Sequence, residues 1–370
     1  SSLSRLDQFN YDLQTYNTVP LILNYTQPIR AYNALKWRKK TAPLQYENAQ
    51  RAYLETMQDI TINVTNLFFT VLSAQENYRQ SVADYEDRKH LFEIAKKRLD
   101  LGTTTKSEVL QMELSLLNAK MSVNSTSLTL RTQLFSLFSY LRIVDYGDIE
   151  LLPPYYMPEI EMNAEQVLDK AWTGSSHSIE QQLNLLESQR ALAEAKANRG
   201  LQVEFRGRLG LSQSANELPA AYRRLKDYET VGLTMTIPIY DWGMGRGKVR
   251  MAKTDVEITK TQIEQANIEF AHDVRTKVMQ FNNQAEQCKT SLRAQDIAAE
   301  RYDIMKKRFE NGSVTVTELN TAQEEFESAQ HQYISQLQQF WTDYYGIQKL
   351  TLYDFIRKEN IGVNFNDLVN

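Results

Sequence analysis

Two copies of one large module make up this sequence. The segment 98–108 (RLDLGTTTKSE) returns as 308–318 (RFENGSVTVTE), and the tetrapeptide TQPI at 26–29 returns as TIPI at 236–239. Both pairs have the same offset, since 308 − 98 = 210 and 236 − 26 = 210. Solenoid repeats have periods of roughly 20 to 50 residues, so this period indicates two large modules instead. We therefore expect function from what the two modules build together.

Long helices are predicted for most of each module. Only 13 Gly and 8 Pro interrupt the 370 residues, and apolar residues recur at seven-residue intervals over 44–99 and 249–309. A helix of about 60 residues would reach roughly 90 Å. A heptad pattern of this length predicts supercoiling against neighbouring helices. The two heptad columns are Tyr46, Tyr53, Ile60 and Leu67 in the first copy, and Val249, Val256, Ile263 and Phe270 in the second.

Each long helix is expected to end at a glycine, Gly102 or Gly312, because glycine adopts the left-handed C-terminal conformation at little cost. The spacing of Thr105 with Glu108, and of Thr315 with Glu318, predicts a capping box that begins the next helix. Second helices are then predicted over 108–141 and 318–345, with shorter helices over 163–171 and 179–199.

Alternating segments predict membrane-spanning strands. Residues 21–29, 203–211 and 231–239 alternate between apolar and polar, over about the 9 to 11 residues that a spanning strand needs. A soluble antiparallel sheet with one solvated face is the alternative. Aromatic residues at the segment ends favour the membrane interpretation. They are Tyr16, Tyr32, Trp37, Tyr228, Tyr240 and Trp242. The polar segments 1–18 and 212–229 are expected to be outer loops.

One chain cannot close such a barrel. Two strand pairs leave open edges, whose unpaired backbone groups would cost several kcal/mol each in lipid. Several identical protomers must therefore combine their strands.

Other functional classes find little support in the sequence. The net charge of −4 excludes the basic excess of a nucleic-acid-binding protein. Cys288 is alone, and His90, His177, His272 and His331 have no metal-ligand spacing, so we expect no metal, no cofactor and no enzyme. The glycine-rich segment 243–247 superficially resembles a phosphate loop, but a flexible joint between strand and helix explains it better. No run of apolar residues is long enough for a transmembrane helix.

The order strand, strand, long helix, glycine turn, helix, present twice, resembles the TolC family of outer-membrane efflux and secretion channels. The segments that carry the resemblance are 26–29, 98–102, 236–241 and 308–312. It implies a mainly α fold with a small β part: long antiparallel coiled-coil helices forming a trimeric α-barrel tunnel, capped by a transmembrane β-barrel with four strands per protomer.

The resemblance also implies a location and partners. The protein would lie in the bacterial outer membrane with its helices in the periplasm, as a homotrimer surrounded by outer-membrane lipid. It would be the passive exit duct of a tripartite efflux pump or type I secretion system, working with a periplasmic adaptor (membrane fusion) protein and an inner-membrane transporter. The alternative is a soluble periplasmic coiled-coil scaffold or adaptor, which explains the heptads but not the alternating strands.

Functional positions follow from the same resemblance. The entrance and adaptor contact would be Leu101, Gly102, Thr103, Thr104, Asn311, Gly312, Ser313 and Val314. The entrance gate would be Glu108, Phe309, Glu318 and Thr321. Val314 stands where a well-studied member has a latching arginine, and Phe309 where it has a tyrosine, so closure is expected to depend on packing. Glu108 and Glu318 are compatible with both a capping and a gating role.

The expected organisation has six parts. By the offset, the counterpart of 163–210 would precede residue 1, so an N-terminal helix and most of a first strand are expected to be absent. The parts are 1–30, first-copy strands and outer loop; 31–144, first helical hairpin; 145–200, equatorial connection and helices; 201–242, second-copy strands; 243–345, second helical hairpin; and 346–370, C-terminal equatorial segment.

Overall fold

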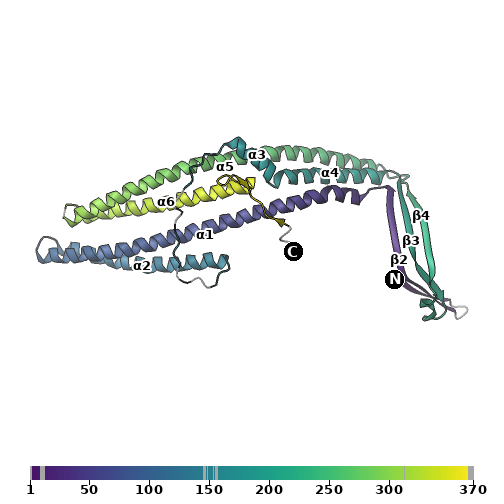
Figure 1. Ribbon diagram of the computed structural model, residues 1–370, viewed down its shortest axis with the longest axis horizontal. Helices are drawn as coiled ribbons and strands as arrows, with labels where there is room; N and C mark the ends of the chain where they lie inside the picture. Colours follow the sequence, from purple (N-terminus) through teal and green to yellow (C-terminus); the bar gives the residue numbers. More distant parts are fainter. Residues whose placement is uncertain are drawn as a thin grey trace. The chain divides into compact units, whose positions relative to one another are not determined.

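The fold was obtained as a computed structural model that describes residues 2–8, 13–144, 147, 149–152, 154, 157–311 and 313–365. Helices dominate it (Figure 1). In chain order the elements are β1 Ser2–Gln8, β2 Leu13–Arg30, α1 Ala34–Asp100, α2 Lys106–Tyr140, α3 Ala164–Gly174, α4 His177–Arg199, β3 Gln202–Ala215, η1 Ala220–Tyr222, β4 Lys226–Thr236, α5 Met244–Glu310, α6 Val316–Thr351, β5 Tyr353–Asp354 and β6 Glu359–Asn360.

The repeat is visible in the helix bounds. Both α1 and α5 have 67 residues, and their first residues are 244 − 34 = 210 apart, as are their last, 310 − 100 = 210. The start of α1 differs from the prediction, because the helix begins ten residues before Leu44 and includes Pro43. A proline removes one N–H···O bond and strains the preceding turn, yet the helix continues through it.

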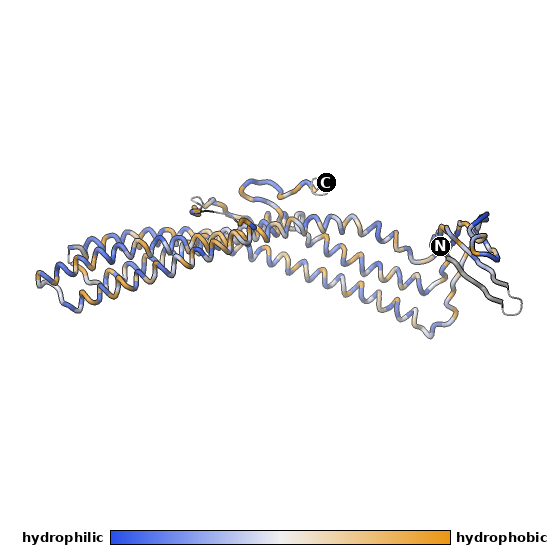
Figure 2. Tube along the Cα trace, turned by 90° about the horizontal axis from the view of Figure 1, so that it is seen from below, coloured by the Kyte–Doolittle hydropathy of each residue, from blue (hydrophilic) through white to orange (hydrophobic). Residues whose placement is uncertain are grey.

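The chain divides into two compact units, which we describe separately. Unit 1 contains residues 1–48 and 177–268, and unit 2 contains residues 49–176 and 269–370. No helix in the described ranges is apolar over enough of its length to cross a bilayer, and Figure 2 shows hydrophilic and hydrophobic residues closely interspersed along the helices.

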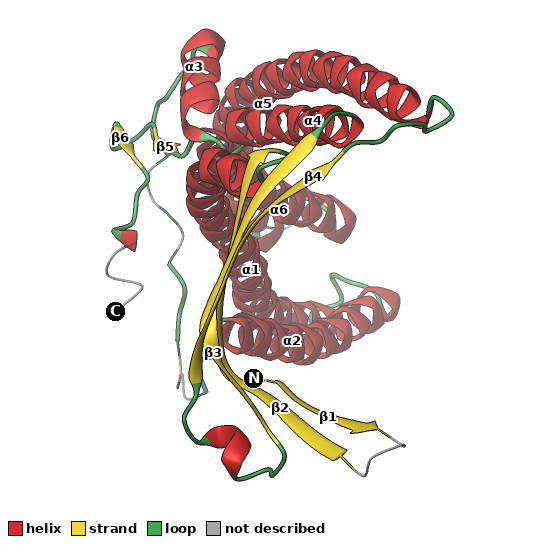
Figure 3. Ribbon diagram, turned by 90° about the vertical axis from the view of Figure 1, so that its right-hand side faces the viewer, coloured by secondary structure: helices red, strands yellow, loops and turns green. Residues whose placement is uncertain are grey.

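Unit 1 holds a four-stranded antiparallel sheet in the order β1-β2-β3-β4 (Figure 3). Its register confirms the predicted alternation, because directly paired residues share a face. One face is largely apolar, from the pairs Leu21↔Leu211, Leu23↔Leu209, Phe205↔Leu233 and Val203↔Met235. The other is polar, from the pairs Asn24↔Arg208, Thr26↔Arg206, Arg208↔Thr230 and Glu204↔Thr234.

The strands extend further than predicted at their outer ends. β1 and the first residues of β2 lie within 1–18, and β3 and β4 continue into 212–229, both of which were expected to be loops. Strands pair through backbone groups, which remain available beside polar side chains. The strands therefore continue beyond the point where the apolar alternation stops. Among the predicted interfacial aromatics, Tyr228 pairs with Gly210 and therefore shares the polar face.

Unit 2 is built from the two antiparallel hairpins, and the helices lie in the order α5, α6, α1, α2 (Figures 1 and 3). Three apolar clusters join them. One lies between α3, α5 and α6 around Phe281 and Phe340. A second joins α1 to α6 through Phe69, Leu72 and Leu337 and includes Cys288 of α5. Burial raises the pKa of the Cys288 thiol to about 11.

The C-terminal segment returns to the first cluster. α6 continues six residues past the predicted end at Tyr345, and Gly346 lies within the helix. The helix ends at Thr351, and the next residue, Leu352, has the left-handed conformation with φ +47°. The buried Tyr344 hydroxyl donates to Asp354 Oδ1 at 2.7 Å and accepts from the Ile356 amide at 3.1 Å. These bonds fix the β5–β6 turn against the helices, a contact that the mixed sequence of 346–370 did not predict.

Candidate functional site

The first helical turn is closed by a Schellman motif. Gly102 has φ +66°, which a residue with a Cβ adopts only under strain. The Gly102 amide donates to the Leu99 carbonyl at 2.9 Å, and the Thr103 amide donates to the Arg98 carbonyl at 2.9 Å. These two bonds satisfy carbonyls that the helix end would otherwise leave free. The predicted left-handed helix end at Gly102 is therefore confirmed.

Both predicted capping boxes are present. The Thr105 hydroxyl accepts from the Glu108 amide at 3.2 Å, and Glu108 Oε2 accepts from the Thr105 amide at 3.0 Å. At the second turn the corresponding distances are 3.3 and 2.7 Å for Thr315 and Glu318. Each helix start thus has two of its free amides satisfied.

These bonds favour the charged form of both carboxyls. The Thr104 hydroxyl and the Thr105 amide, which donate to Glu108, lower the pKa of that carboxyl. The Thr315 amide and hydroxyl lower the pKa of Glu318 in the same way. Both carboxyls are exposed, so each carries a negative charge at neutral pH beside its turn.

The second turn repeats the geometry of the first where it is described. The Ser313 amide donates to the Arg308 carbonyl at 2.9 Å, in the same 6→1 pattern as Thr103 to Arg98. Asn311 and Ser313 are exposed. Gly312, a predicted contact residue, lies outside the described residues.

The two turns line one cavity of about 300 Å³. It lies among the predicted entrance residues of both copies, which sequence alone could not place beside each other. The first copy contributes Arg98, Thr103, Thr104 and Glu108, and the second contributes Phe309, Val314, Thr315 and Thr317. Leu101 does not line this cavity and is 77% exposed.

Phe309 belongs to the apolar core of this tip. It is buried at 7% exposure among Leu91, Phe92, Met112 and Leu319, with Val314 packed against the same cluster. The Arg98 guanidinium lies 5.9 Å from the centre of the Phe309 ring. Of the four residues predicted as a gate, Phe309 is internal to the protomer, whereas Glu108, Glu318 and Thr321 are exposed.

A polar network centred on Arg88, which was not predicted, joins the two hairpins near the turns. Arg88 Nε donates to both Asp84 oxygens at 2.9 Å, and Nη2 donates to Gln323 Oε1 at 3.2 Å. Nη1 donates to the Ser115 hydroxyl of α2 and to Asn320 of α6. The Asp84 and Arg88 side chains are 14% and 20% exposed. One guanidinium thereby links α1, α2 and α6.

A second polar contact joins α1 to α5. Asp87 accepts from Lys306 Nζ at 2.7 Å and from the Tyr302 hydroxyl at 3.3 Å. Burial, reinforced by the Asp87 charge, raises the pKa of Tyr302, so the hydroxyl stays protonated and able to donate. The spacing of Asp84 and Arg88 within one helix was a sequence signal for an ion pair, but the partners on α5 and α6 were not visible in sequence.

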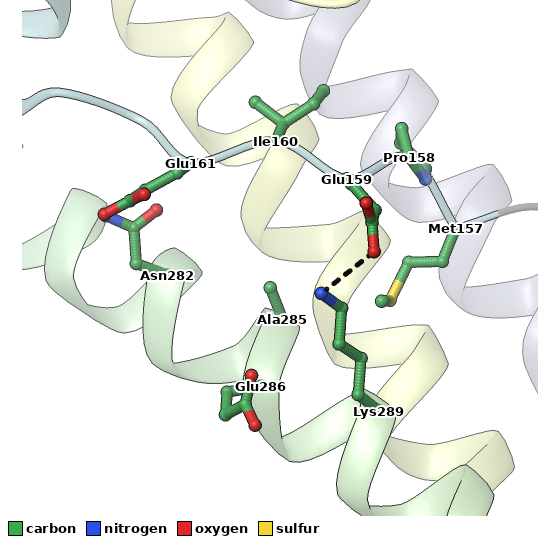
Figure 4. A pocket seen from close by; sticks show the side chains of 9 residues that line it. All are labelled: Met157, Pro158, Glu159, Ile160, Glu161, Asn282, Ala285, Glu286 and Lys289. Atoms are coloured by element: carbon green, nitrogen blue, oxygen red, sulfur yellow. Dashed lines mark ion pairs between the residues drawn. The ribbon is translucent and has the colours of Figure 1, made fainter.

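The surface of unit 2 also has an open cavity of about 410 Å³ between the connection 157–161 and α5 (Figure 4). Three of its polar side chains have partners: Glu159 lies 3.3 Å from Lys289, and Asn282 bonds the backbone of Met162. Across the described ranges, no group of three His, Cys, Asp or Glu side chains is placed to hold a metal ion.

The glycine-rich segment 243–247 is closed by an aspartate. Asp241 accepts from the Gly243 amide at 3.0 Å and the Gly245 amide at 2.7 Å, and these bonds lower the pKa of that carboxyl. Gly243 has φ +81°. A phosphate would need the same amides, so the phosphate-loop alternative does not fit. Asp241 thus caps the start of α5 at the joint between β4 and α5.

Known proteins share this architecture. The profile of the outer membrane efflux protein family matches residues 1–141 and 175–351. The structure resembles the Campylobacter jejuni CmeC outer membrane channel with a TM-score of 0.73 at 14% identity, covering 100% of this chain and 79% of that one. It resembles the open state of the Neisseria gonorrhoeae MtrE outer membrane channel with a TM-score of 0.72 at 13% identity, covering 98% and 81%. No curated protein sequence matches.

A membrane-type sheet joined to long paired helices defines the class of tunnel-forming outer-membrane channels. The chain belongs to the outer membrane efflux protein family. It is thus an outer-membrane efflux channel subunit with helices that extend into the periplasm. This confirms the predicted class, the mainly α fold with a small β part, and the location, and it contradicts the soluble scaffold alternative. The family and the related structures are channel proteins and not enzymes.

Proposed function

We propose that three copies of this chain assemble head to tail into a closed exit duct. The observation that carries this proposal is an apolar stripe on α2 that the protomer leaves uncovered. Its spacing is that of a coiled-coil seam, with members seven residues apart. The stripe consists of Leu110, Leu114, Leu117, Met121, Leu128 and Phe135, all exposed.

The opposite edge of the helical layer supplies the complementary surface. α5 exposes Met279, Ile297 and Ile304 within unit 2, whereas α6, between α5 and α1, exposes no large apolar side chain among its described residues. Uncovered apolar side chains on both edge helices support packing of α2 of one protomer on α5 of the next. This heterologous contact forms a ring when the rotation closes.

The sheet has the same need for a partner. β1 and β4 are its edges, and each edge in lipid must pair its backbone groups. Pairing β4 of one protomer with β1 of the next in three copies gives a twelve-stranded barrel. Its lipid-facing side would be the apolar face that includes Leu21, Leu209 and Leu233.

The parts of the chain then have distinct tasks. Residues 1–30 and 201–242 form the barrel, 31–144 and 243–345 the tunnel hairpins, and 145–200 with 346–370 the equatorial part. A periplasmic adaptor contacts the turns at Leu101–Thr104 and Asn311–Val314, and connects the duct to an inner-membrane transporter. The exposed carboxylates Glu108 and Glu318 and the neighbouring Thr321 lie at the entrance.

Conductance in a planar bilayer tests this function. We expect the wild-type protein to give ohmic conductance that requires the trimer. Glu318→Gln should lower the preference for cations, measured as the reversal potential in a salt gradient, because it removes one negative charge per protomer from the entrance. Glu324→Gln, on another face of α6, is the matched control and should leave the potential unchanged.

The two possible failures have different meanings. No conductance from a folded trimer would contradict the duct itself. A conducting Glu318→Gln channel with the wild-type reversal potential would leave Glu318 as a helix cap alone.

A further inference from the structure

The helix ends next to the sheet carry a concentration of positive charge that neither the fold nor the duct requires. Of the eight exposed Lys and Arg side chains in the first three turns of α1 and α5, six lie on a common face of their own helix, although the whole chain has a net charge of −4. We name them the basic collar: Lys36, Lys39 and Lys40 of α1, and Arg246, Arg250 and Lys253 of α5. In α1 the spacing is i, i+3, i+4 and in α5 it is i, i+4, i+7, so each set shares one face of its helix.

Strand register brings these helix starts to one end of the sheet, where β2 and β4 finish and β3 begins. Arg30, the last residue of β2, pairs with Val203, and Gln202, the first of β3, pairs with Thr236, the last of β4. α1 follows β2, α4 precedes β3 and α5 follows β4. Arg199, at the end of α4, lies so close to Gly245 that an added Cβ would come within 3.2 Å of it. Lys196 of α4 adds a further exposed cation nearby.

Few acidic residues lie at this end of the sheet. Asp241 is the only acid in the segments 30–41, 196–200 and 239–253, and its carboxylate accepts from two backbone amides. None of the collar cations forms an ion pair with any acid in the described part of the chain. The charge of Arg246 acts on the nearby Asp241 carboxyl, and the other five collar charges remain available to an external anion.

The residues between the apolar face and the collar suit a bilayer interface. Exposed Ile237 and Ile239 continue the aliphatic face past the end of β4, and Tyr240 and Trp242 follow, with ring centres 4.7 Å apart. On the α1 side, Lys40 Nζ lies 5.0 Å above the Trp37 ring. Aliphatic, then aromatic, then cationic side chains match the acyl, interfacial and phosphate layers of a leaflet.

We propose that the basic collar binds the phosphates of anionic glycerophospholipids in the periplasmic leaflet of the outer membrane. The inference rests on the proposed barrel, because the strands must lie in the bilayer for the collar to reach headgroups. Clustered Lys and Arg at a membrane surface attract anionic lipid by charge, with Arg also able to bond phosphate through two N–H groups. The collar thus selects the lipids that surround the base of the barrel.

Lipid retention tests the collar. The full-length protein is reconstituted in vesicles of phosphatidylcholine with a minor fraction of phosphatidylglycerol, extracted in detergent, and the lipids retained by the trimer are quantified by mass spectrometry. We expect phosphatidylglycerol to be enriched over its bulk fraction. The variant Lys36→Gln/Lys39→Gln/Lys40→Gln should reduce this enrichment at least ~3-fold.

Two controls separate charge from fold. Lys36→Arg/Lys39→Arg/Lys40→Arg keeps the charge and should keep the enrichment. Lys97→Gln/Lys120→Gln/Arg293→Gln removes the same charge from exposed positions of unit 2 and should match the wild type. High salt should weaken the wild-type enrichment because it screens the collar, which provides a test even if the glutamine variant does not fold.

Two results would overturn the proposal: a conducting wild-type trimer without enrichment, or an unchanged enrichment in the glutamine variant. If that variant also changes the reversal potential, the collar lies in the pore and faces soluble anions. Wild-type protein that conducts in no vesicle would instead contradict the proposed duct, and the collar with it.

Discussion

At the residue scale, the helical turns are the part of the candidate site that the sequence predicts most completely. Their hydrogen bonds follow from residue chemistry alone: glycine where φ is positive, and a hydroxyl and a carboxylate three residues apart where amides are free. Thr105, Glu108, Thr315 and Glu318 could therefore be assigned from their spacing along the chain. Phe309 could not, because its burial depends on Leu91 and Met112, which lie on other helices.

The capping threonines should stabilise both turns. Thr105→Ala and Thr315→Ala should each cost about 1 kcal/mol in local stability, since each removes an amide partner at a helix start. Amide hydrogen exchange of residues 105–108 and 315–318 measures this as faster exchange. Ser107→Ala, two residues from the first cap, is the control, and equal rates in all four proteins would contradict the assignment.

The two carboxyls also predict a dependence on pH. Because the folded-state pKa of Glu108 and Glu318 lies below the ordinary value of 4.5, their contribution is present above that pH and is lost as the pH falls through the folded pKa. The stability difference between wild type and Glu108→Gln/Glu318→Gln, followed by thermal unfolding, should thus shrink below about pH 4.5. A difference that grows with acidity would contradict this.

At the element scale, the contacts between the hairpins combine apolar clusters with buried polar links. The heptads predicted that the helices would pack side by side, and the equal lengths of α1 and α5 follow from the repeat. Which residues face each other across α1 and α6 depends on the helix order in the layer, which periodicity does not encode. The Arg88 network escaped prediction for this reason.

Removal of Arg88 should destabilise the tip strongly. Arg88→Ala leaves Asp84 largely buried without its cation, at a cost of roughly 3 kcal/mol. Arg190→Ala removes an ion pair with Glu187, but both side chains of that pair are exposed, at 44% and 46%, so it should cost less than about 1 kcal/mol. Thermal unfolding of both variants at neutral pH distinguishes the two cases. Equal losses would mean that Arg88 is not a structural link.

At the scale of the whole molecule, the sequence predicted the class of fold through the repeat, the alternating strands and the heptads. It misplaced the outer strand ends, where backbone pairing continues through polar residues, and it left 346–370 unassigned because the bonds of Tyr344 to Asp354 and Ile356 depend on the folded hairpin. Assembly could be expected, because a single chain leaves the backbone groups at the edges of its sheet unpaired.

The α2 stripe provides the test of assembly. Met121→Lys/Leu128→Lys places two charges in the proposed seam, where burial without partners is costly, so we expect monomers in detergent by light scattering. The control is Lys120→Gln, beside the stripe but polar in the wild type. A stable trimer of the double lysine variant would contradict the head-to-tail seam.

Duplication gave α2 and α6 the same origin but different neighbours. α6 buries its apolar side chains within its own chain, since none of the large ones described is exposed, so a harmful substitution in its core acts within each newly made polypeptide, before any copies meet. The apolar stripe of α2 would be covered only by another copy of the chain. A substitution in the stripe can therefore leave the fold of the single polypeptide unchanged and weaken only the assembly. In a mixed trimer it would also reduce the function of the normal copies. Two descendants of one ancestral helix are in this way subject to selection at different stages of the life of the protein.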